Sequence, residues 1–137
     1  MLILDSLAYI YLFLFSIYHL IQGTVSVFFP DFAIKFNEVL YGFKPREKEQ
    51  LKMTFKPWGS FAFAAGVSGF LVLINMEKYF LFLIPFAILL IFRAGYRLIL
   101  KKEIMGYWKV TKIQNWRMMI IQLIGFLLFT IFVISRL

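Results

Sequence analysis

The 137-residue sequence contains no cysteine. Disulfides, thiolate nucleophiles, iron–sulfur clusters and cysteine-based zinc or copper sites are therefore excluded. Histidine is almost as scarce, because His19 is the single copy. One imidazole can neither build a conventional zinc site, which takes several protein ligands, nor hold a haem between two histidines. We therefore expect no metal site.

Acidic side chains are missing from the interiors of the long hydrophobic runs. Proton-coupled carriers commonly use carboxylates at membrane depth, so the sequence disfavours that class. It also lacks a glycine-rich phosphate loop, an HExxH motif and a Ser/His/Asp arrangement. No residue is therefore assigned a catalytic role, and the balance is against an enzyme.

Hydrophobic residues are abundant, at 62% of the chain, and aromatic residues alone make up 20%. Soluble globular proteins contain roughly 45–50% apolar residues. A water-soluble domain of this size has too much surface to conceal so many apolar side chains, whereas a membrane helix exposes them to lipid at no cost. The composition indicates an integral membrane protein.

Four segments approach or exceed the roughly 20 apolar residues that a spanning helix needs. They are residues 2–29, 58–74, 79–100 and 118–134. We predict an all-α fold, a four-helix transmembrane bundle that forms a single domain over residues 1–137. Apolar residues at helical spacing after Pro30 predict a short amphipathic interfacial helix, followed by a solvated connector over Lys44–Lys56. Pro85 is expected to kink the third span.

Basic residues are concentrated in two of the connections. Residues 31–57 and 101–117 together contain eleven Lys and Arg, whereas only Lys78 and Arg136 lie on the opposite side. The positive-inside rule then places both connections in the cytoplasm and both termini outside the cell membrane. The net charge of +8 is best explained by anionic lipid headgroups, and we expect no nucleic acid partner. Asp5 and Glu77 are expected to be solvated at the outer edge.

A stripe of small and polar residues follows one face of the first span. Ser16, His19, Gly23 and Ser26 recur at steps of three and four, with Gln22 beside them. Polar groups at membrane depth usually face the interior of a bundle. We therefore expect this face to be turned inward.

The second span carries a stripe of small residues. Its members are Ala62, Ala65, Gly66 and Gly69. Small residues four apart let helix backbones approach closely, so the stripe predicts a helix-packing face. A face for another subunit is the alternative.

Several polar side chains fall at a similar depth. At about 1.5 Å per residue, His19 lies about 25 Å from Leu2, and Arg93 about 21 Å from Tyr79. The candidate ligand-binding residues are His19, Gln22, Trp58, Arg93, Arg97 and Gln122. The competing interpretations are that Arg97 reaches toward the headgroups and that the others make structural hydrogen bonds between helices.

The layout resembles the DoxX-like superfamily of small four-helix membrane proteins. The resemblance is carried by Gly23, by the run Phe28-Phe29-Pro30-Asp31-Phe32, and by a Gly/Ala-rich second span from Trp58-Gly59 to Gly69. It implies a four-helix fold. The superfamily includes a subunit associated with quinone-linked sulfur oxidation, but no active-site motif of that subunit can be assigned to residues here, and the missing cysteines argue against thiol chemistry.

Three functions remain open. The first is binding of an amphiphile, a lipid or a quinone, by a small membrane protein or accessory subunit. The second is a subunit of a quinone-linked oxidoreductase, with His19 transferring protons. The third is a structural or assembly partner in a homo-oligomer or a larger membrane complex.

Overall fold

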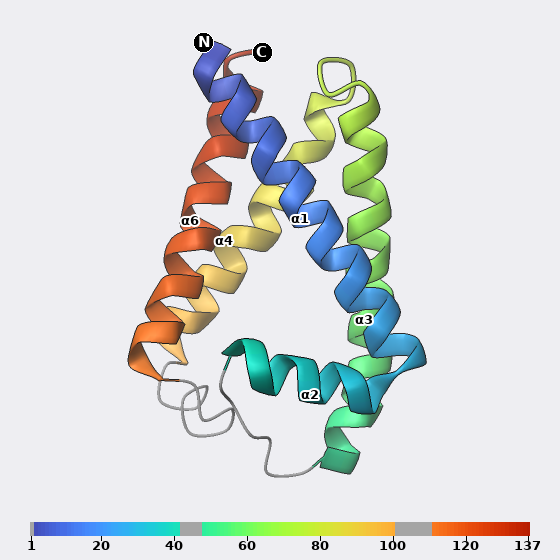
Figure 1. Ribbon diagram of the computed structural model, residues 1–137. Coiled ribbons are helices and arrows are strands. Elements are labelled where there is room, and N and C mark those ends of the chain that lie inside the picture. The colour runs from blue at the N-terminus through green and yellow to red at the C-terminus, as the bar shows by residue number, and fades with distance from the viewer. Residues whose placement is uncertain (1, 42–47, 101–110) are drawn as a thin grey trace.

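The computed structural model describes residues 2–41, 48–100 and 111–137, and these residues form helices without strands (Figure 1). The elements in chain order are α1 (Leu2–Phe28), α2 (Pro30–Tyr41), α3 (Lys48–Ile74), the 3₁₀ turn η1 (Phe80–Phe82), α4 (Leu83–Ile99) and α6 (Lys112–Ile134). Four helical stretches are long and apolar enough to cross a membrane, as predicted. Five of the basic loop residues, Lys44, Arg46, Lys101, Lys102 and Lys109, lie outside the described ranges.

Two helices begin earlier than hydropathy predicts. α3 starts at Lys48, so the expected solvated connector is helical from there onward. Pro57 lies inside this helix and removes one backbone donor, but this turn is exposed and the freed carbonyl can bond water. α6 starts at Lys112 because Thr111 caps it, with the Thr111 hydroxyl and the Gln114 side chain forming a reciprocal capping box.

Pro85 does not kink the middle of the third span, contrary to our expectation. It is the third residue of α4, directly after η1. In the first turn of a helix the missing N–H would have no partner in any case, so proline is tolerated there. Pro85 thus marks the start of α4.

The four long helices form two pairs, and the first joins α1 to α3. Glycines line this contact: a Cβ on Gly66 would lie 2.6 Å from the backbone nitrogen of Leu20, and one on Gly23 would overlap the backbone of Phe63. Gly69 is buried in the same face, against Ser16. The glycines of the small-residue stripe therefore pack against α1 within the chain, and its two alanines, Ala62 and Ala65, are half-buried.

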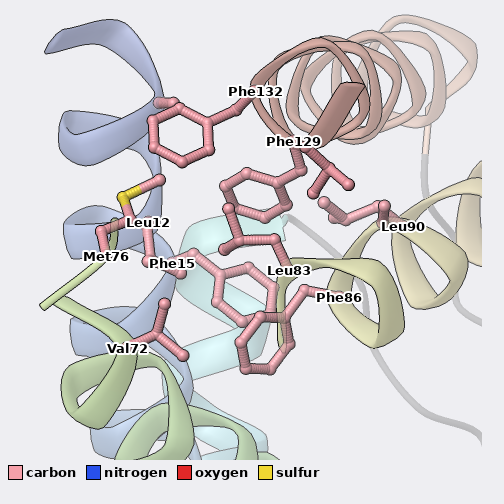
Figure 2. Packing of buried hydrophobic residues seen from close by; sticks show 12 residues of the cluster. Leu12, Phe15, Val72, Met76, Leu83, Phe86, Leu90, Phe129 and Phe132 are labelled. Atoms are coloured by element: carbon pink, nitrogen blue, oxygen red, sulfur yellow. The ribbon is translucent and has the colours of Figure 1, made fainter. Parts of the chain in front are cut away.

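The second pair joins α4 to the antiparallel α6. In Figure 1 the two pairs lie close together at the end that holds both termini, and they spread apart toward the opposite end. Where they meet, side chains from α1, α3, α4 and α6 form one apolar core that includes Leu12, Phe15, Leu83, Phe86 and Phe129 (Figure 2). The core thus occupies the half of the bundle nearest the termini.

An ion cluster closes the bundle at the end that holds the termini. The Arg136 guanidinium donates to both carboxylate oxygens of Glu77, at 2.7 and 2.6 Å, and lies 3.1 Å from Asp5 Oδ1. The same guanidinium stacks 3.4 Å from the centre of the Phe132 ring. Glu77 is exposed, as expected, although it pairs with Arg136, whereas Asp5 was expected to be solvated and is half-buried against the same guanidinium. These contacts tie together the first turn of α1, the turn after α3 and the end of α6.

α2 runs across the opposite end of the bundle (Figure 1). It packs against α1 and α3 through Ala33 and Ile34, which are buried, while Phe32 remains exposed. An ion pair of 2.8 Å between Asp31 and Lys52 fixes its first turn to the polar extension of α3. The predicted short helix is therefore present, and its place at a membrane surface is part of the proposal below.

Candidate functional site

His19 lies on α1 next to the apolar core, on the side of the core away from the termini. Its side chain is 6% exposed, and its ring packs 3.9 Å, between centroids, from the ring of Phe15. Ser16, Gly23 and Ser26 on the same face are buried as well, as the stripe predicts. Because Phe15 also packs against Phe86 of α4, His19 sits where the apolar core ends.

Arg93 of α4 contacts this histidine. Its Nη1 lies 3.1 Å from His19 Nε2, and His19 Nδ1 lies 2.8 Å from the carbonyl oxygen of Phe15. A carbonyl only accepts and a guanidinium only donates. His19 therefore donates through Nδ1–H and accepts at Nε2, so its ring is neutral and its tautomer is fixed by both neighbours. In the described part of the chain this is the one hydrogen bond that the Arg93 side chain makes.

Gln122 of α6 supplies a buried polar group without a partner. The residue is 4% exposed, and its Oε1 accepts no hydrogen bond from the described residues. An unpaired buried amide oxygen costs about 1–3 kcal/mol, so native proteins rarely keep one without a reason. A bound molecule that donates to this oxygen would remove the cost.

Tyr11 lies next to Gln122, at the contact between α1 and α6. Its hydroxyl donates to the carbonyl oxygen of Ile121, at 3.0 Å, and its ring edge fills the space left by the missing side chain of Gly125. Gly125 shares a helix face with Gln122, three residues away. Sequence analysis missed Tyr11, and the signal for it was a glycine on the facing helix.

The register between α4 and α6 places Arg93 and Gln122 at a similar level. Arg97 Nη1 donates to Asn115 Oδ1 at 3.2 Å, and Asn115 Nδ2 donates to the Arg97 carbonyl at 3.2 Å, which anchors the two antiparallel helices. From that anchor Arg93 lies four residues along α4, about 6 Å, and Gln122 seven residues along α6, about 10.5 Å. The two residues thus differ in depth by less than one turn.

Two interhelical contacts therefore define four polar side chains, which we call the polar cluster: Tyr11 next to Gln122 where α1 meets α6, and His19 hydrogen-bonded to Arg93 where α1 meets α4. The sequence analysis named three of them as candidates and missed Tyr11. The cluster offers guanidinium donors, an amide that can donate or accept, and a phenol. It can hydrogen-bond a small polar group, but no described His, Asp or Glu side chains gather around it in threes as metal ligands would.

Three other candidate residues lie elsewhere. Arg97 is paired with Asn115, which sequence analysis did not single out. Gln22 faces α2 and lines a small apolar pocket with Val25, Phe36 and their neighbours. Trp58 is 66% exposed on α3, beside Phe61. The structure therefore does not join these three to His19.

Comparison with models of protein families, with curated proteins and with solved structures finds no match for this chain. The resemblance to the DoxX-like superfamily therefore stays a prediction.

Proposed function

We propose that this chain is a multi-pass membrane protein that binds an amphiphile, a lipid or an isoprenoid quinone, with the polar head of the molecule at the polar cluster. The observation that carries the proposal is the buried amide oxygen of Gln122, which has no hydrogen-bond partner among the described residues. Gln122 lies at a similar depth to the Arg93–His19 hydrogen bond. Polar groups at membrane depth are costly and tend to mark ligand sites.

The position of the polar cluster in the bundle favours an amphiphile over a water-soluble ligand. The cluster lies between helices that are long and apolar enough to span a membrane, and the outward faces of these helices carry exposed Phe, Ile and Leu side chains. A ligand that reaches the cluster between the two helix pairs would cross this apolar surface, and an acyl or isoprenoid chain is compatible with it.

In this proposal the distribution of basic residues sets the orientation of the chain in the membrane. The end that carries α2 and the connections 31–57 and 101–117 faces the cytoplasm, and the ion cluster of Arg136 faces outward. α2 then lies at the inner membrane surface. The polar cluster is displaced toward the inner leaflet, since His19 lies about 14 Å from the end of α1 at Phe28.

The other two functions have less support. A proton-transferring role in a quinone-linked oxidoreductase would need an imidazole nitrogen that meets the quinone, but His19 Nδ1 donates to the Phe15 carbonyl and Nε2 accepts from Arg93. A role as an assembly partner through the small-residue stripe would need that face to be open, but α1 covers it. Neither observation favours these functions over amphiphile binding.

The test is mass spectrometry of gently purified protein under native conditions. The wild type should carry a lipid or quinone in stoichiometric amount, and Arg93→Leu and Gln122→Leu should lose it. Gln122→Leu is the sharper variant, because it removes an unpaired buried amide and should keep or raise stability while it abolishes binding. Trp58→Leu is the matched control and should keep the ligand. A wild-type protein that is consistently empty would contradict the proposal.

A further inference from the structure

Among the residues that the structure describes, no carboxylate forms an ion pair with Arg93. Among the four apolar helical stretches, only that of α1 contains an acidic residue, Asp5. Asp5 is fourteen residues from His19, about 21 Å along α1, and it is paired with Arg136. On α2, Asp31 is paired with Lys52, and Glu38 makes no ion pair or hydrogen bond with Arg93. Arg93 is therefore not neutralised by either of these paired carboxylates.

The other members of the polar cluster do not compensate this charge either. The hydrogen bonds of His19 fix a neutral ring, and the Gln122 amide is neutral by nature. Tyr11 uses its hydroxyl proton to donate to the Ile121 carbonyl, so it is a neutral phenol. The polar cluster thus has a formal charge of +1 in a largely apolar environment, which is unfavourable without a counter-charge.

We infer that the head group held at Arg93 is a singly charged oxyacid anion, a carboxylate or a phosphodiester, attached to an apolar chain. This inference rests on the proposed function and narrows its ligand class. A neutral quinone would leave the arginine charge unpaired, and a dianionic phosphate monoester would introduce a second charge with no partner. A single negative charge balances the site.

The geometry suits such a head group. A guanidinium presents its N–H donors in a planar fork that can bond two oxygens of one oxyacid at once. His19 occupies only one of these donors, at Nη1, and thereby holds the fork in place. The Gln122 amide can donate to an oxyanion through Nε2 or accept from a neighbouring hydroxyl through Oε1.

The experiment compares the affinity of the delipidated full-length protein for amphiphiles of matched chain, at pH 9 in one detergent. The probes are oleate, oleoyl lysophosphatidylglycerol, oleyl alcohol and oleyl phosphate, each with one chain, which carry a carboxylate, a phosphodiester, a hydroxyl and a dianionic phosphate. We expect oleate or lysophosphatidylglycerol to bind about tenfold more tightly than oleyl alcohol, because hydrogen bonds to charged groups are about twice as strong as neutral ones. Which of the two binds better identifies the source of the anion.

Three variants assign the preference to Arg93. Arg93→Gln should bind oleate and oleyl alcohol with equal affinity, and Arg93→Lys should restore part of the preference by restoring the charge. Arg97→Gln is the matched control, because it removes the same charge one turn along α4, where the side chain bonds Asn115, and should keep the tenfold difference.

Two results would overturn the inference while leaving the proposed function intact. One is that oleyl alcohol or an isoprenoid quinone binds as tightly as oleate in the wild type. The other is that oleyl phosphate binds more tightly than both singly charged probes. If no amphiphile binds the wild type, the proposed function fails together with the inference. If Arg93→Gln does not fold, Arg97→Gln still decides, since loss of the tenfold difference in that variant would assign the preference to Arg97 and overturn the inference.

Discussion

Replacing Gly66 by alanine should loosen the α1–α3 pair. The added Cβ would lie 2.6 Å from the backbone nitrogen of Leu20 and 2.9 Å from the carbonyl oxygen of Ser16. The first distance is about 0.8 Å short of the 3.4 Å at which ordinary contact begins. Because both neighbours are backbone atoms, no side chain can turn aside, and the two helices must separate.

Gly95→Ala is the matched control for this substitution. It lies in α4, and a Cβ there would meet nothing within 4 Å. Both substitutions gain the same helix preference of alanine over glycine, about 1 kcal/mol in water, so this term cancels in the comparison. The difference between the two variants then isolates the steric cost, which is typically about 1–3 kcal/mol for an overpacked contact.

The assay is unfolding in mixed micelles by titration with sodium dodecyl sulfate, followed by tryptophan fluorescence. Gly66→Ala should unfold at a clearly lower fraction of dodecyl sulfate than the wild type, whereas Gly95→Ala should unfold at the same fraction or a higher one. Gly23→Ala should resemble Gly66→Ala, because its Cβ would overlap the backbone of Phe63. If the midpoints of Gly66→Ala and Gly95→Ala coincide, the close approach of α1 and α3 is not what holds the pair together.

Two further predictions concern the end of the bundle that holds the termini and the orientation of the chain. The hydrogen bonds from Arg136 hold the pKa of Glu77 below its ordinary value of 4.5, so this contribution to stability is present above that value and is lost as pH falls through the lowered pKa. The thermal stability of the wild type should therefore fall between about pH 5 and 3, and the stability of Glu77→Gln should change less over the same range. Since the chain has no cysteine, Asn75→Cys and Lys48→Cys can be labelled without background: an impermeant maleimide added to intact cells should reach the first and not the second. The reverse labelling would invert the proposed orientation.

Hydropathy identifies the four apolar stretches, but it does not identify where their helices begin. The polar turns from Lys48 to Lys56 carry no apolar signal, although they extend α3 and provide the partner of Asp31. The start of α6 could have been predicted, because Thr111 and Gln114 have the spacing of a capping box. Pro85 was assigned to the helix interior because the 3₁₀ turn before it is as apolar as the helix itself.

For the candidate site, the level of each residue along its helix could be predicted, but the side of the bundle that the residue faces could not. The rise per residue places His19 and Arg93 at matching levels, and they do form a hydrogen bond. The same arithmetic cannot tell which side of the bundle a residue faces, so Gln22 and Trp58 were included although one faces α2 and the other is exposed. Tyr11 could be found only by knowing that α6 faces α1 at Gly125.

Phe15 belongs to the apolar core and also contacts His19 of the polar cluster. Its carbonyl oxygen fixes His19, and its ring packs against Phe86 and Phe129 on two other helices. The imidazole that holds Arg93 is therefore preorganised by three helices, and no loop has to close around it. A head group that binds there meets a guanidinium already in position, so little conformational entropy is lost on binding and affinity can come from few contacts.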